Sequence, residues 1–137
     1  MVEFTITYEG GLRCAATHGP SGTRIQTDAP TDNLGQGEAF SPTDLCCTSL
    51  GTCMVTTMAI YAQKNGFEFP AGAKLVVRKV MTSEPPRRIA RIETDLDLPL
   101  PENHPQRAEL ERVAIHCPVA LSLSPDVEKP VSFRWVG

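Results

Sequence analysis

The stretch SPTDLCCTSLGTCMVTTMAIYAQKNG, residues 41–66, predicts the central helix of the domain because it is long and largely apolar. Ser41 is a suitable N-cap, and Asp44 stands three residues after it, as in a capping box. Gly66 has the residue type that most often follows the last helical turn. The sequence therefore predicts a helix that has Ser41 as its N-cap, begins at Pro42 and runs to Asn65.

Apolar side chains cover most of this predicted helix. One stripe with helical spacing consists of Cys47, Leu50, Met54, Met58 and Tyr61. Further apolar residues lie around the rest of the helix, namely Val55, Ala59, Ile60 and Ala62. Serine and threonine interrupt the stretch repeatedly, which favours the central helix of a core over a membrane span.

Strand patterns lie on both sides of the helix. The expected strands are 2–9, 12–18, 23–28, 74–83, 88–98 and 130–135, with a second helix over 104–117 and a short helical turn over 118–124. The fold class is therefore predicted as α+β, with antiparallel sheets around a buried helix pair, in one domain spanning 1–137. Residues 29–40, APTDNLGQGEAF, are rich in turn formers and are expected to form a loop that lines a site.

Charge and cysteine usage exclude several classes of function. The chain of 137 residues has a formal net charge of −3, and its basic residues are scattered, so no nucleic-acid partner is expected. The N-terminus MVEFTITYEG lacks the features of a signal peptide, which predicts a cytoplasmic protein without a membrane partner. Five cysteines are an odd number, and we expect them to be reduced thiols at rest.

Most catalytic motifs are missing. No C-x-x-C occurs, and His18, His104 and His116 show no ligand spacing, so no metal site is predicted. A phosphate loop and a G-x-S-x-G elbow are also absent, while Cys–His catalysis stays open. Thiol chemistry is the remaining candidate, because Cys53 and Cys117 are both expected to point into the same interior. The alternative is that both thiols only pack as small apolar residues.

Two cysteine-containing stretches carry a resemblance to a known family. SPTDLCCTSLGTC, from residue 41, and HCPVALSLSPDVE, from residue 116, resemble the signature stretches of the OsmC/Ohr family of osmotically inducible and organic hydroperoxide resistance proteins. The order of the expected elements also fits over nearly the whole chain. The resemblance implies an OsmC-like fold, an intertwined homodimer and a thiol-dependent peroxidase for organic hydroperoxides. It further implies an external dithiol reductant and no metal or organic cofactor.

The resemblance also assigns roles to residues. Cys53 would be the peroxidatic cysteine that becomes a sulfenic acid, and Cys117 would be the resolving thiol. Cys53 lies about three turns into its helix, too far for the helix dipole to stabilise a thiolate, and burial disfavours one. A cation is therefore needed, and the family places an arginine just after the Gly-Gly turn, which is Arg13 here, with Arg24 as the alternative.

The position of Cys117 directly before Pro118 favours Cys117 as the more acidic thiol. Pro118 can open a helical turn with Cys117 as its cap, and a thiol at a helix start is favoured as a thiolate. The family pattern nevertheless assigns the nucleophile to Cys53.

Two features depart from the family pattern. Thr43 stands where the hydroperoxidase branch has a glutamate that anchors the arginine, and Glu38 in the preceding loop is the expected substitute. Cys46 and Cys47 stand at usually aliphatic positions; Cys46 is either apolar filler or a competing resolving thiol. The leading hypothesis is a peroxidase, and its alternatives are a non-catalytic binding protein for a small apolar ligand and a redox sensor with the same cysteine pair.

Overall fold

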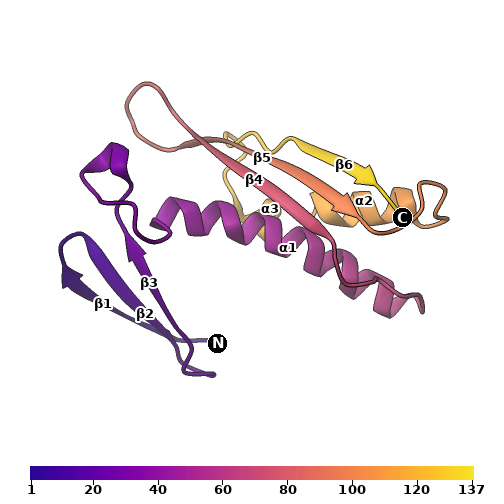
Figure 1. Ribbon diagram of the computed structural model, residues 1–137, viewed down its shortest axis with the longest axis horizontal. Helices are drawn as coiled ribbons and strands as arrows, with labels where there is room; N and C mark the ends of the chain where they lie inside the picture. Colours follow the sequence, from indigo (N-terminus) through magenta and orange to yellow (C-terminus); the bar gives the residue numbers. More distant parts are fainter. The chain divides into compact units, whose positions relative to one another are not determined.

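The computed structural model describes all residues, 1–137, and has the predicted α+β architecture (Figure 1). Its elements are β1 Phe4–Gly10, β2 Arg13–His18, β3 Arg24–Asp28, η1 Thr31–Asn33, α1 Pro42–Lys64, β4 Lys74–Met81, β5 Ile89–Leu98, α2 Arg107–Ile115, α3 Pro118–Ser122 and β6 Val131–Trp135. Contacts divide the chain into two compact units, Met1–Cys46 and Cys47–Gly137. The expectation of one domain over 1–137 stays a prediction.

The first unit contains an antiparallel sheet in the order β1-β2-β3. Apolar and polar residues alternate along β1, as the sequence shows, but the apolar side chains of this strand are not covered by other parts of the chain. Phe4 is 62% exposed, Ile6 is 67% exposed and Tyr8 is 63% exposed. Because large apolar side chains are rarely left open together, this face is a candidate contact surface.

The loop after β3 is folded back onto the end of that strand. The Asp28 N–H donates to the Phe40 carbonyl oxygen at 3.3 Å, and the Gly37 N–H donates to the Ala29 carbonyl oxygen at 3.2 Å. Gly35 lies so close to the Ala29 backbone that no Cβ would fit between them. The turn-rich stretch is therefore an ordered loop with fixed ends.

Helix α1 begins and ends almost where the sequence predicts. The Asp44 N–H donates to Ser41 Oγ at 3.1 Å, and the Ser41 N–H donates to Asp44 Oδ2 at 2.9 Å. These two bonds form the predicted capping box and satisfy two amide donors that the first helical turn leaves open. At the other end, Gly66 has a φ of +73°, the left-handed conformation that closes a helix.

The second unit is a sheet in the order β4-β5-β6 whose inner face packs against helices. Alternate residues of β5 are completely buried, among them Ile92, Leu96 and Leu98. The buried stripe of α1 in this unit consists of Cys47, Leu50, Gly51, Met54, Met58 and Ala62. A Cβ at Gly51 would lie 2.8 Å from Val77 Cγ2, so the missing side chain lets β4 approach the helix closely.

The last strand corrects the expectation of purely antiparallel sheets. β4 and β5 pair antiparallel, but β6 pairs parallel to β5, with Thr94 opposite Val131 and Leu98 opposite Trp135. Helices α2 and α3 lie between these strands in the chain and carry it back to the end where β5 starts. A crossover of this kind produces a parallel pair, whereas a short turn produces an antiparallel one.

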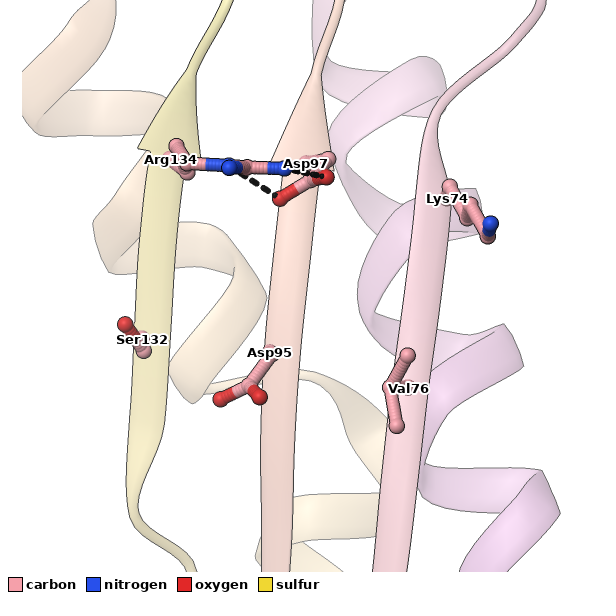
Figure 2. Close-up of a pocket in the computed structure, with 6 residues that line it drawn as sticks. All are labelled: Lys74, Val76, Asp95, Asp97, Ser132 and Arg134. Carbon is pink, nitrogen blue, oxygen red and sulfur yellow. Dashed lines mark hydrogen bonds and ion pairs between the residues drawn. The ribbon is translucent and has the colours of Figure 1, made fainter.

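The outer face of this sheet is charged. Figure 2 shows side chains that project from the side away from the helices, namely Lys74, Val76, Asp95, Asp97, Ser132 and Arg134. Arg134 donates two hydrogen bonds to Asp97, from Nε to Oδ1 and from Nη2 to Oδ2. Arg78 Nη1 forms an ion pair with Asp95 Oδ2 at 2.8 Å. Such exposed and paired charges are typical of a solvated sheet face.

Helix α1 is also long and apolar enough to cross a membrane, judged by length and composition alone. The core helix of a globular protein meets the same two criteria, and in this chain α1 contributes Leu50, Met54 and Met58 to the core of the second unit. The packing therefore agrees with the predicted central core helix.

Candidate functional site

Two thiols lie in one cluster of the second unit. Cys117 is fully buried in the core, and Cys53, half-buried on α1, packs against that same core cluster. Both are free thiols, and Cys53 Sγ lies 3.9 Å from Thr57 Oγ1 in the next helical turn. The sequence expectation that both cysteines point into the same interior agrees with this arrangement.

Cys117 stands where α2 gives way to α3. It is the N-cap of α3, with Pro118 as the first helical residue, as the helix-start argument expects. Burial nevertheless raises the pKa of Cys117, and the Cys53 side chain raises it further. Hydrogen bonds from the backbone N–H groups of Ala120 and Val119 act in the opposite direction but do not outweigh burial. Cys117 is therefore held as a neutral thiol, which removes the argument for it as the acidic one.

Arg13, in the first unit, is surrounded by oxygen acceptors. Its Nη2 atom lies 2.6 Å from Glu38 Oε2 and 3.5 Å from Gln36 Oε1, both contributed by the loop after β3. The same nitrogen lies 3.5 Å from Asp28 Oδ2 at the end of β3. The hydrogen bond and charge of Glu38 raise the pKa of Arg13 further above its usual range, so the guanidinium is permanently charged.

All three contacts of Arg13 end on Nη2. A guanidinium has five N–H donors in a planar fork, so these contacts leave the donors of Nη1 and Nε to other acceptors. The charges in this arginine cluster, defined here as Arg13, Asp28, Gln36 and Glu38, sum to −1 from one cation and two carboxylates. The cluster can therefore offer directed hydrogen bonds, whereas its net charge does not attract an anion.

Glu38 contacts Arg13, as expected for the substitute of the missing glutamate, and Thr43 lies instead in the helix cap, 3.2 Å from Ser41 Oγ. Arg24 lies at the exposed start of β3, opposite Thr17. The roles of Arg13 and Glu38 toward Cys53 stay predictions.

Sequence reasoning missed Asp28 and Gln36. Asp28 directly faces Arg13 in the β2–β3 pairing, and this contact can be recognised only when the register of that hairpin is known. Gln36 belongs to the loop that was expected to line a site, but nothing in its sequence context distinguishes it from the other polar loop residues. The competing thiol, Cys46, is half-buried, and its neighbour Cys47 is buried.

The first unit also contains an apolar cavity of about 700 Å³. Its lining includes Phe4, Ile6, Cys14, Ala16, Ile25 and Leu45. The cavity lies on the uncovered apolar side of the sheet, so it is a candidate for a small apolar ligand or for a covering chain. No group of three or more His, Cys, Asp or Glu side chains is arranged to hold a metal ion.

Comparison with known proteins agrees with this architecture. The family model for OsmC-like proteins matches residues 35–129. A protein of Psychrobacter arcticus, proposed to be an osmotic stress induced and detoxification response protein, is 39% identical with a TM-score of 0.90, over 98% of this chain and 96% of that chain. No curated protein sequence matches the chain.

More distant solved structures share the fold. An organic hydroperoxide resistance protein OsmC of Legionella pneumophila is 12% identical with a TM-score of 0.75, over 97% of this chain and 96% of that one. The organic hydroperoxide resistance protein OhrB of Bacillus subtilis is 12% identical with a TM-score of 0.68, over 98% of each chain. Because the family model covers more than half of its residues, the chain belongs to the OsmC-like protein family.

Proposed function

We propose that this protein is a thiol-dependent peroxidase that reduces organic hydroperoxides. The Cys53 thiolate attacks the O–O bond of ROOH, and with one proton the products are the Cys53 sulfenic acid and the alcohol ROH. The Cys117 thiol then displaces water from the sulfenic acid and forms a Cys53–Cys117 disulfide. An external dithiol reduces this disulfide to two thiols and is itself oxidised to a disulfide.

The observation that carries the proposal is the pair of free thiols in one cluster. Cys53 is half-buried and therefore accessible to a substrate, whereas Cys117 is buried beside it. The pKa of Cys117 is raised by burial and by the Cys53 side chain. This difference suits two roles, because the nucleophile must react as a thiolate and the resolving cysteine can wait as a thiol. The opposite assignment would require the more buried thiol to ionise first.

Arg13 is proposed to stabilise the Cys53 thiolate and the developing charge on the peroxide, with Glu38 orienting it. The Glu38 contact at 2.6 Å and the unused donors on Nη1 and Nε support this role. A guanidinium that is anchored on one nitrogen can present its other donors without the entropy cost of ordering a mobile side chain.

The proposed assembly is a homodimer acting in the cytoplasm. The exposed apolar side of β1 and the apolar cavity in the first unit support an association that covers them. Membership in the OsmC-like family, together with relatives named as organic hydroperoxide resistance proteins, supports a peroxide-related role.

The test treats the reduced protein with stoichiometric cumene hydroperoxide and maps disulfides by peptide mass spectrometry. We expect a Cys53–Cys117 bridge and multi-turnover peroxide consumption with a dithiol, both lost in Cys53→Ser. Cys46→Ser is the matched control on the same helix, and it should retain the bridge and turnover. If the bridge fails to form in wild type, the peroxidase and the redox sensor are both wrong; a bridge without turnover would identify a sensor.

A second candidate function is binding of a small apolar ligand without catalysis. The apolar cavity of about 700 Å³ in the first unit favours it, because that volume is in the range of small-molecule sites. This candidate predicts that Cys53 and Cys117 remain thiols after peroxide treatment, and that a fluorescent apolar probe binds wild type and Cys53→Ser equally well.

A further inference from the structure

Asp28 is a buried carboxylate at the centre of the arginine cluster. Its side chain is only 1% exposed, and its Oδ1 atom has no hydrogen-bond partner in the chain. The other oxygen, Oδ2, accepts from the Glu38 N–H at 3.0 Å and from Arg13 Nη2 at 3.5 Å. A single oxygen atom therefore joins the guanidinium to the backbone of the loop that carries Glu38.

A carboxylate in this position has a cost that needs an explanation. An ionised group without full hydrogen bonding is destabilising when buried, and here one of the two oxygens lacks any donor. Stability alone would be served better by an apolar side chain or by a neutral one with fewer acceptors. A buried group that is retained at such a cost is a candidate for a role beyond packing.

The contact with Glu38 alone does not fix Arg13. Glu38 is 58% exposed and lies in a loop, and ion pairs between exposed side chains restrain their partners weakly. Asp28 instead lies at the end of β3, directly opposite Arg13 in the strand pairing. Groups held on strands are positioned more precisely than groups held on loops.

We propose that Asp28 is the positioning residue for Arg13 and Glu38. Asp28 Oδ2 accepts from Arg13 Nη2 and from the Glu38 backbone N–H, so that Arg13 and Glu38 are both held against the end of β3. The proposal rests on the proposed peroxidase function, because the consequence of this positioning is measured in the oxidation of Cys53.

The charge of the cluster makes the direction of the effect informative. With two carboxylates and one guanidinium, the cluster carries a net charge of −1, and Asp28 contributes half of the negative charge. If Asp28 acted only through its charge, removing it would make a nearby thiolate more favourable and would speed oxidation. If Asp28 acts by positioning Arg13, removing it slows oxidation, which is the opposite sign.

The experiment compares Asp28→Asn and Asp28→Ala with wild type, and uses Asp32→Asn, an exposed carboxylate in the same loop, as the matched control. Two quantities are measured: the rate constant for oxidation of Cys53 by cumene hydroperoxide in a single turnover, and the pH midpoint of Cys53 alkylation followed by peptide mass spectrometry. Circular dichroism and the thermal midpoint establish that each variant is folded. Asp28→Asn preserves the shape and one acceptor oxygen, so it serves even if Asp28→Ala does not fold.

We expect Asp28→Ala to slow Cys53 oxidation by about tenfold or more, as misplacement of a group that acts on the reacting atoms does. Asp28→Asn should fall between Asp28→Ala and wild type, because its amide oxygen still accepts from the Glu38 N–H. The pH midpoint of alkylation should move upward in both variants, and Asp32→Asn should match wild type.

Two results would overturn the inference. Faster oxidation in the Asp28 variants would mean that Asp28 acts only through its charge, and unchanged rates and pH midpoints in folded variants would mean that its role is structural. In both cases the oxidation of wild type still supports the proposed function. A wild type that does not react with the hydroperoxide would instead overturn the proposed function, and this inference with it.

Discussion

Strand β1 of the first sheet and strand β5 of the second both alternate apolar and polar residues, but their surroundings differ. In β5, the apolar residues Ile92 and Leu96 are completely buried beneath helices of the second unit. In β1, Phe4 and Ile6 are more than half exposed. A period of two therefore identifies the apolar side of a strand, whereas what covers that side depends on elements elsewhere in the chain or in another chain.

Loss of packing in the covered sheet should destabilise the protein more than any other change considered below. Leu96→Ala deletes a fully buried side chain between β5 and the helices, and should lower the free energy of unfolding by about 2–5 kcal/mol. Urea denaturation followed by circular dichroism measures this change. A loss smaller than about 1 kcal/mol would contradict the well-packed core that distinguishes this sheet from the first.

If the proposed homodimer covers the first sheet, changes on that sheet should alter association. Ile6→Ser removes an apolar side chain from the exposed face of β1 and should raise the dissociation constant of the proposed homodimer about tenfold or more, since burying such a side chain contributes roughly 1.5–3 kcal/mol. Analytical ultracentrifugation across a concentration series measures it. Thr7→Ser, on the other side of the same strand, is the control. Equal dissociation constants for Ile6→Ser and wild type would show that this face is not covered by a second copy.

A smaller effect is expected where α1 meets β4. Gly51→Ala places a Cβ about 2.8 Å from Val77 Cγ2, which forces a shift in a packed region. Overpacking costs about 1–3 kcal/mol, while alanine in a helix is favoured over glycine by about 1 kcal/mol, so a net loss near 1 kcal/mol is expected. A double-mutant cycle with Val77→Ala in urea denaturation should recover part of the loss. Additive losses would contradict a direct contact.

The smallest expected effect concerns pH and the buried thiol. The pKa of Cys117 is raised by burial, so above the usual cysteine range the unfolded chain releases a proton that the folded chain retains. Stability should therefore be unaffected by this group at neutral pH and should fall as the pH rises from about 8.5 upward. Urea denaturation between pH 7 and 10 tests this; Cys117→Ala should show a shallower decline than wild type, and identical slopes would contradict it.

The helix and its caps could be predicted from the sequence because they depend on neighbouring residues. Ser41 and Asp44 form reciprocal hydrogen bonds across three positions. Gly66 ends the helix because glycine readily adopts the left-handed conformation. The expected helices already directed Cys53 and Cys117 toward one interior, whereas only the family resemblance assigned roles to them and selected Arg13.

Features that depend on distant pairing could not be predicted in the same way. The direction of β6 follows from where α2 and α3 return the chain, and the contact of Asp28 with Arg13 follows from the register of β2 and β3. In the sequence, Asp28 was only the polar end of a short strand. A residue whose role comes from the residue opposite it needs the pairing to be known first.

The attachment of Arg13 through Nη2 alone determines which residue can stand at this position. A lysine carries its three donors on one nitrogen, so an ammonium held between Asp28 and Glu38 could not also present donors from separate nitrogens on the other side of the group, as a planar guanidinium does. Arg13→Lys would preserve the positive charge, but it would remove the arrangement in which Nη2 contacts the cluster and Nη1 and Nε are left to other acceptors. Position 13 therefore selects for arginine by shape rather than by charge.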